Sequence, residues 1–208
     1  MTNFLKLFFV SFILCAAACA PKKVEMPAVQ QQSLAVVLAE RRSIERIDAA
    51  MSVVFEKTDS EMHGEAVLDI AQDGDLQMKV STLGILAMDL TSKNGRVMST
   101  PKLDRSKTAI LTQGLRDSLF WWDLTDFTVQ EENDRLILQN ATRQVVLDRK
   151  TMLPQKQRIS FDDGKQLTVF YDNPAQVKGV WYQSKMRIEL SRYAVTLTLR
   201  EISFAGQR

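Results

Sequence analysis

Apolar and polar residues alternate with a period of two along most of this 208-residue chain. Successive side chains of a β-strand point to opposite faces, so the alternation predicts strands with one apolar and one polar face. Turn signals such as Asp73-Gly74, Asn94-Gly95 and Asp172-Asn173-Pro174 separate the runs at hairpin spacing. The pattern predicts about ten or eleven antiparallel strands, in a sheet that curls to bury its apolar face.

Two segments predict helices instead. Ser33 precedes an amphipathic helix that we expect to extend to about Ile47, with one apolar stripe. Residues 106–122 are apolar on nearly every side, which is typical of a buried helix. In a sheet protein this second helix predicts a plug or lid inside the curled sheet. The pattern leaves open whether helix and sheet enclose a cavity or form one solid core.

The N-terminal 18 residues resemble a bacterial secretion signal that ends at a lipid-attachment site. Lys6 precedes a short apolar run, and three alanines stand directly before Cys19. The run is too short for a permanent membrane span, which takes about 20 apolar residues. We therefore expect removal of residues 1–18 and acylation of Cys19; the alternative is an ordinary cleaved signal with an incidental cysteine. Residues 19–32, with two prolines and a glutamine run, predict a flexible tether before a domain at 33–208.

Signal removal and acylation of Cys19 would leave the mature chain without a free cysteine thiol. Cleavage removes Cys15 and acylation consumes Cys19, so neither a disulfide nor a thiolate metal site is expected. Ala20 rather than aspartate follows the acylated cysteine, which predicts the outer membrane as the address. The mature chain carries 26 basic and 25 acidic residues without a basic cluster, so nucleic acid is not an expected partner.

The sequence offers little for catalysis, and we predict neither an enzyme nor a cofactor. His63 is the one histidine, and we interpret it as a surface residue because a structural metal needs three or four ligands. Ser99 and Lys102 have the Ser-x-x-Lys spacing of penicillin-recognising enzymes, but Pro101 disfavours the helix that this serine would begin.

The order of these elements resembles the lipoprotein-localisation superfamily (LolA/LolB-like), closest in layout to its outer-membrane receptor branch. The resemblance rests on Cys19, the tether, the first helix, the strand pair around residues 81–90, the helix ending at residues 119–123 and the many strands. It implies a mainly β fold with helices, an unclosed antiparallel barrel of about eleven strands with a helical lid or plug. It also implies an apolar cavity that shelters acyl chains of lipids or lipoproteins.

The resemblance also implies roles for particular residues. Leu83-Gly84 matches an exposed hairpin tip that contacts the membrane or a partner, although Thr82 stands where the receptor tends to have proline. The residues expected to line the cavity are Leu76, Met78, Leu86, Met88, Leu90, Leu111, Leu115, Leu119, Trp122 and Met186.

The expected function follows from these roles. We expect a lipid-anchored, periplasm-facing outer-membrane lipoprotein that binds a lipid or an acylated protein for transport or insertion. A periplasmic carrier or another envelope protein is a candidate partner. The alternative is a non-enzymatic envelope scaffold of the same fold with a filled core.

Overall fold

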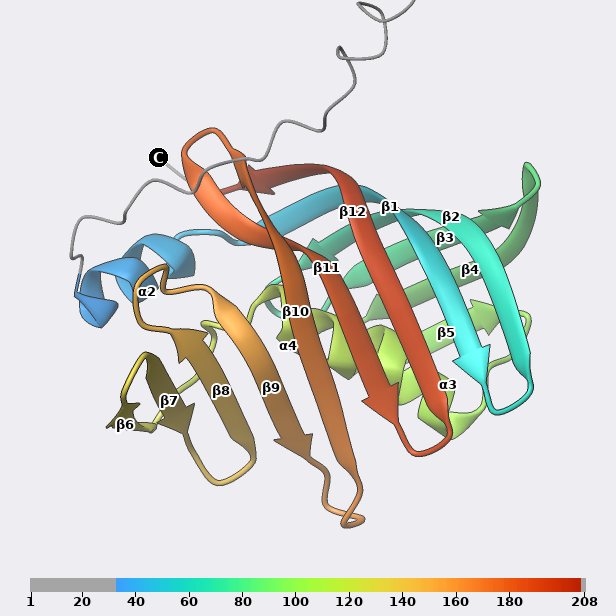
Figure 1. The fold of residues 1–208 in the computed structure, drawn as a ribbon. Coiled ribbons are helices and arrows are strands. Elements are labelled where there is room, and N and C mark those ends of the chain that lie inside the picture. The colour runs from blue at the N-terminus through green and yellow to red at the C-terminus, as the bar shows by residue number, and fades with distance from the viewer. Residues whose placement is uncertain (1–32, 207–208) are drawn as a thin grey trace, which may run out of the picture.

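A computed structural model describes residues 33–206 of the chain. Within that range, twelve strands form a single antiparallel sheet in the order β5-β4-β3-β2-β1-β12-β11-β10-β9-β8-β7-β6. The sheet curls over helical segments on its concave side but stays open, because β5 and β6 are both edge strands (Figure 1). The predicted unclosed barrel with a helical element is confirmed. Cys19, the expected signal and the tether lie outside the described residues.

The strands are long and are mostly joined by short hairpins. They are β1 Arg46–Lys57, β2 Ser60–Ala71, β3 Leu76–Thr82, β4 Ile85–Lys93, β5 Arg96–Thr100, β6 Thr128–Glu132, β7 Arg135–Gln139, β8 Arg143–Asp148, β9 Pro154–Ser160, β10 Gln166–Val177, β11 Val180–Leu190 and β12 Tyr193–Ala205. Strands that are neighbours in sequence are also neighbours in the sheet, except β5 and β6, which lie at its two edges. The pairing of β1 with β12 joins the two halves of the sheet.

The helical segments fall into two groups. Helix α2, Leu34–Arg42, begins at Ser33, whose hydroxyl accepts a hydrogen bond from the Val36 amide. The second group is continuous: α3 Arg105–Ala109, a π-helical turn Ile110–Gly114, and α4 Leu115–Leu119. Figure 1 shows α3 and α4 beneath the concave face and α2 at one end of the sheet.

Two sequence predictions of secondary structure were wrong. The first helix ends at Arg42 rather than near Ile47, and Ile47 belongs to β1, a strand that was not predicted. The Ser43 amide and hydroxyl both bond carbonyls of the last turn, and the chain then enters the sheet. The turn expected at residues 172–174 lies inside β10, and the chain reverses at Lys178-Gly179 instead.

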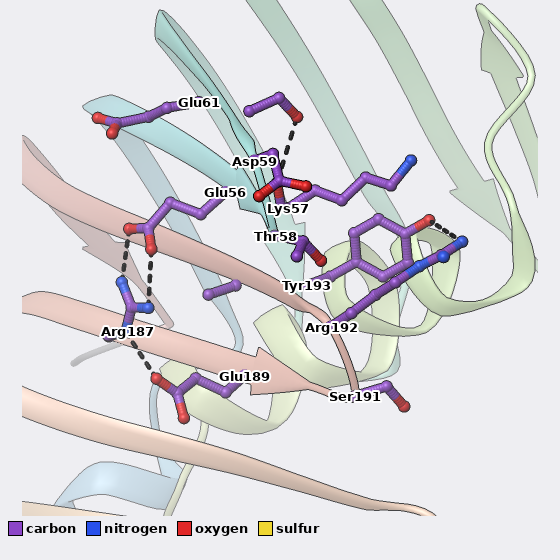
Figure 2. A pocket seen from close by; sticks show the side chains of 12 residues that line it. Glu56, Lys57, Thr58, Asp59, Glu61, Arg187, Glu189, Ser191, Arg192 and Tyr193 are labelled. Atoms are coloured by element: carbon purple, nitrogen blue, oxygen red, sulfur yellow. Dashed lines mark hydrogen bonds and ion pairs between the residues drawn. The ribbon is translucent and has the colours of Figure 1, made fainter.

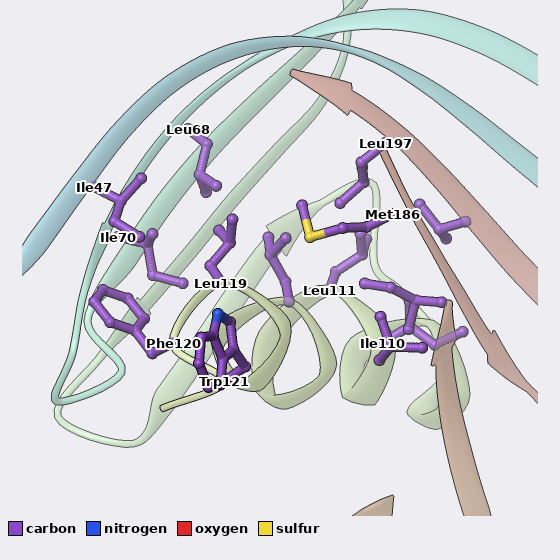
Figure 3. Packing of buried hydrophobic residues seen from close by; sticks show 14 of the residues in the cluster. Ile47, Leu68, Ile70, Ile110, Leu111, Leu119, Phe120, Trp121, Met186 and Leu197 are labelled. Atoms are coloured by element: carbon purple, nitrogen blue, oxygen red, sulfur yellow. The ribbon is translucent and has the colours of Figure 1, made fainter. Parts of the chain in front are cut away.

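One continuous core fills most of the space between sheet and helices. The helical side contributes Ile110, Leu111, Leu119, Phe120 and Trp121, which face Ile47, Leu68, Ile70, Met186 and Leu197 of the sheet (Figure 3). Helix and sheet touch directly at Gly114, where an added Cβ would lie 2.7 Å from Leu167 Cδ1. The helix therefore acts as a plug packed on the sheet. None of the helices in residues 33–206 combines the length and apolar character needed to span a bilayer.

Candidate functional site: an apolar cleft and a hairpin tip

Hairpins of an antiparallel meander alternate between its two ends, and this places several features together. The β1–β2, β3–β4 and β11–β12 turns lie at one end, together with the start of α3. We call this the α3 end. Helix α2 and the β10–β11 turn lie at the opposite end, which we call the α2 end (Figure 1).

An apolar cleft of about 320 Å³ opens at the α3 end, between the beginning of the helical plug and the sheet. Strands β1, β2 and β4 contribute Phe55, Met62 and Met88, while the plug contributes Ile110 and Leu111. Pro101, Leu103 and Val195 also line it. The cleft forms because the strands of the β1–β2 hairpin extend beyond the start of the plug. Glu56, Lys57, Glu61 and Lys107 line it as well, but most of its exposed lining is apolar, which suits an apolar guest.

A polar groove of about 680 Å³ adjoins the cleft along the hairpin turns (Figure 2). Arg187 bridges two carboxylates in it, donating to both Glu56 oxygens at 2.5 and 2.8 Å and to Glu189 at 2.7 Å. The hydrogen bond from Arg187 lowers the pKa of Glu56, and the bond to Glu56 raises the pKa of Arg187. Tyr193 lines both the groove and the cleft and so marks their boundary.

Asp104 joins the start of the plug to the β11–β12 hairpin. Its carboxylate caps α3 by accepting from the Lys107 amide at 2.9 Å, and it also accepts from the Tyr193 hydroxyl at 2.9 Å. The amide hydrogen bond lowers the pKa of Asp104. These contacts fix one wall of the cleft.

The β3–β4 hairpin carries the most exposed apolar residues of the α3 end. Leu83 is 98% exposed and Gly84 forms the turn with it; both have positive φ, 51° and 79°. This conformation suits Asn-Gly, which the β4–β5 turn does use at Asn94-Gly95 with φ of 50° and 73°. A leucine there is unfavourable both for its backbone and for its hydration. Ile85 and Leu86 are also exposed, and the three side chains form what we call the apolar tip.

The ten residues expected to line a cavity divide into four groups. Met88 and Leu111 line the cleft. Leu119, Trp122 and Met186 line a void of only about 30 Å³ near the α2 end. Leu76, Met78, Leu90 and Leu115 are buried in the packed core.

Leu86 was expected to point inward, and this was wrong. A β-bulge between Val80 and Ser81 interrupts the pairing, so Leu86 lies opposite Ser81 rather than in phase with Met88. Its side chain is 57% exposed. The bulge removes Leu86 from the interior and adds it to the apolar tip. Alternation alone gives no sign of such an insertion.

A buried polar network behind the plug was not predicted from sequence. Arg143 on β8 donates to the carbonyls of Asp123 at 2.7 Å and Asp117 at 3.2 Å, and it lies 3.6 Å from the Asp117 carboxylate. The Tyr171 hydroxyl oxygen lies 2.6 Å from Gln157 Oε1 and 3.1 Å from the Ser118 carbonyl oxygen, and burial raises the pKa of Tyr171. These bonds hold the C-terminal part of the plug to β8–β10.

At the α2 end, two arginines of helix α2 bond to backbone carbonyls of neighbouring segments. Arg41 donates to the Trp181 carbonyl, and burial lowers the pKa of its guanidinium to about 10. Arg42 donates to the Leu124 carbonyl at 3.0 Å. Helix α2 thereby covers the small void beside Trp122.

The candidate catalytic residues are not assembled into a site. His63 is exposed and lies 2.7 Å from Glu61, and Ser99 accepts a hydrogen bond from the Leu103 amide. Across residues 33–206 no group of three or more histidine, cysteine or carboxylate side chains is arranged to hold a metal ion.

The curled open sheet with a helical plug is similar in fold to two solved structures. A LolA superfamily protein from Nitrosomonas europaea superposes with a TM-score of 0.58 at 12% identity, over 83% of this chain and 94% of that one. A DUF1329 family protein from Desulfovibrio piger also gives 0.58, at 11% identity, over 83% and 90%. No protein-family model and no curated protein sequence matches this chain.

Proposed function

We propose that this chain is a lipid-anchored envelope protein that shelters an acyl chain in the cleft and exchanges it with a membrane at the apolar tip. The acyl chain belongs to a lipid or to an acylated protein. Cys19 carries the anchor, and the outer membrane is the proposed location, with the domain facing the periplasm. No covalent step is involved.

The observation that carries this proposal is the position of the cleft. Its apolar walls open at the same end of the sheet as Leu83, Ile85 and Leu86, so the cleft and the apolar tip can face one membrane together. Each methylene transferred from water into such surroundings contributes about 0.8 kcal/mol. The named LolA-superfamily relative supports the proposal at the level of fold.

The apolar tip provides the contact with the membrane. Insertion of a fully exposed leucine into lipid contributes about 1.5–3 kcal/mol, which favours transient rather than permanent attachment. While the tip is inserted, the mouth of the cleft lies against the bilayer and the acyl chain moves between two apolar surroundings. A periplasmic carrier that docks on the same tip is the second partner that we propose.

A second function has one observation in its favour. The plug and sheet fill most of the interior, with four of the expected cavity residues wholly inside the packed core. A scaffold that binds envelope proteins needs no more than this. The two functions differ in whether the cleft takes up an acyl chain.

Lipid analysis of the purified protein tests the proposal. Residues 33–206 form one sheet around one core, so a chain beginning at Ala20 retains the fold without the anchor. We expect organic extracts of this protein from bacterial cells to contain acyl lipids at close to one per chain. In the Met62→Trp variant the larger side chain occupies the mouth of the cleft, and the lipid content should fall.

Val67→Trp is the matched control for this substitution. Val67 lies on the same strand, on the opposite face of the sheet, and is exposed. Its replacement should leave the lipid content unchanged. Protein that is empty from every preparation, or loss of lipid in both variants alike, would favour the scaffold.

A further inference from the structure

The two edge strands of the sheet, β5 and β6, each pair with a neighbouring strand on one side only. Figure 1 shows them at opposite sides of the curled sheet. All five residues of β6 and four of the five residues of β5 are exposed, so both edges are accessible. An accessible edge presents a row of backbone N–H and C=O groups to which another strand can bond.

Both edges also expose apolar side chains. Val97 and Met98 of β5 are 40% and 66% exposed, and Val129 of β6 is 45% exposed. Apolar residues on an edge strand favour pairing with a strand of another chain, and soluble proteins usually avoid them there. A strand added to either edge would cover part of this apolar surface.

The two edges match each other in length and direction. Each strand has five residues, and β5 and β6 are antiparallel because the twelve strands alternate in direction across the sheet. A second copy of the chain can therefore place its β6 beside β5 and continue the same antiparallel sheet.

One register keeps the faces of the two copies aligned. Val97 and Ser99 lie opposite Ser92 and Leu90 of β4, so they are on the concave face of β5. Val129 lies opposite Leu138 of β7, on the concave face of β6. Pairing all five residues of β5 with all five of β6 places Ser99 opposite Val129, with both side chains on the concave face.

The charges of the two edges are opposite in sign, and the same register places Arg96 opposite Glu132. Residues 90–103 contain three basic side chains and no acidic one, while residues 123–134 contain five acidic side chains and no basic one. Charged neighbours reduce this contrast without removing it. The β5 edge keeps one positive charge and the β6 edge two negative charges when the neighbours Asp75, Asp89, Arg116, Arg135 and Arg149 are counted.

We infer that this protein assembles head to tail, with β5 of one copy pairing with β6 of the next. Each added copy leaves one β5 and one β6 edge free, so assembly continues beyond a dimer or closes into a ring. A single pair of short strands buries less than the roughly 1,200–2,000 Å² of a stable interface, so the association is weak and depends on concentration. The inference does not rest on acyl binding, because no residue of β5 or β6 lines the cleft.

Sedimentation velocity of the chain beginning at Ala20 tests the assembly. The weight-average sedimentation coefficient should rise between about 10 μM and 1 mM protein, the range expected for such a small interface. Arg96→Glu and Glu132→Arg should each weaken association about tenfold by placing like charges opposite one another, and the double variant should restore it. Lys178→Glu reverses an exposed charge in the β10–β11 turn, away from both edges, and should have no effect.

Single cysteines test the register, since the chain from Ala20 onward contains none. Opposite residues of a strand pair lie close enough for a disulfide. Under mild oxidation, a mixture of the Ser99→Cys and Val129→Cys variants should therefore form linked dimers, and neither variant alone should do so. Glu131→Cys in place of Val129→Cys is the matched control, one position pair out of register, and should link less. Thermal unfolding establishes that each variant is folded.

Three results would overturn head-to-tail assembly. They are a sedimentation coefficient that is independent of concentration, a double charge reversal that does not restore association, and disulfide-linked dimers of Ser99→Cys alone, which would mean that β5 pairs with β5. None of them affects the lipid content of the purified protein, which tests the proposed function separately.

Discussion

Replacement of Leu83 by asparagine should make the protein more stable and less able to bind membranes. Leu83 has φ of 51° and a fully exposed side chain, so the folded state gains no burial from it and bears the backbone cost. A non-glycine residue in this conformation costs about 1–2 kcal/mol, and asparagine tolerates it better. Asn94 occupies the equivalent turn position in the β4–β5 hairpin, with φ of 50°.

The two effects have opposite signs and separate magnitudes. We expect Leu83→Asn to raise the free energy of unfolding by about 1 kcal/mol, or the Tm by about 2–4 °C for a domain of this size. Loss of leucine insertion should weaken partitioning to phosphatidylcholine vesicles by about 1.5–3 kcal/mol, roughly 10-fold to 150-fold. Calorimetry and vesicle sedimentation of the chain from Ala20 onward measure these quantities.

The matched control exchanges the two turn residues. Leu83→Asn combined with Asn94→Leu conserves the composition and should return the Tm to its original value. Vesicle binding should stay low, because Asn94 is flanked by Lys93 and Arg96 instead of other apolar residues. A lower Tm for Leu83→Asn would show that Leu83 packs in the folded state, and unchanged vesicle binding would refute its role in insertion.

Three further substitutions test the fold behind the cleft. Gly114→Ala should destabilise by about 1–3 kcal/mol in chemical denaturation, since its Cβ would lie 2.7 Å from Leu167 Cδ1; an unchanged midpoint would contradict the direct plug-to-sheet contact. Arg143→Met should cost about 3 kcal/mol by leaving Asp117 buried with fewer partners, and a stability equal to the original would show that the network is dispensable. Asp104→Ala should cost about 1 kcal/mol at pH 7 through loss of the helix cap. Because folding lowers the pKa of Asp104, its carboxylate stabilises the folded state at neutral pH, and this stabilisation is lost as pH falls below about 4. The free energies of unfolding of the original protein and the Asp104→Ala variant should therefore converge in acid. A constant difference between them in urea titrations from pH 7 to pH 3 would contradict this role of Asp104.

Period-two alternation was sufficient to predict most strands and the open sheet. It works here because one face of the sheet meets a continuous apolar core, as at Met78 and Leu90. The alternation did not predict β1, because Ile47 also continues the apolar stripe of the helix that begins at Leu34. The local sequence does not show where the helical period of 3.6 residues gives way to the strand period of two. The hydrogen bonds of Ser43 end the helix, and pairing with β12 from the far end of the chain completes the strand.

The candidate site was predicted only in part. The resemblance placed Leu83-Gly84 at an exposed hairpin tip, and the structure has Leu83 almost fully exposed in that turn. The cleft is not visible, since its walls combine residues from β1, β4, β12 and the plug that only the sheet topology brings together. The bulge at Leu86 and the position of Lys107 over the Tyr193 ring likewise depend on register and on distant hairpins. These are tertiary features without a local pattern.

Photo-crosslinking with a dodecanoate that carries a diazirine at its last carbon tests the acyl-binding cleft most directly. Peptide mapping of the labelled protein should place the adducts on Phe55, Met88 and Ile110, and excess unlabelled dodecanoate should suppress them. Adducts confined to the exposed surface or to the α2 end, or labelling that competitor does not reduce, would contradict uptake of an acyl chain by this cleft.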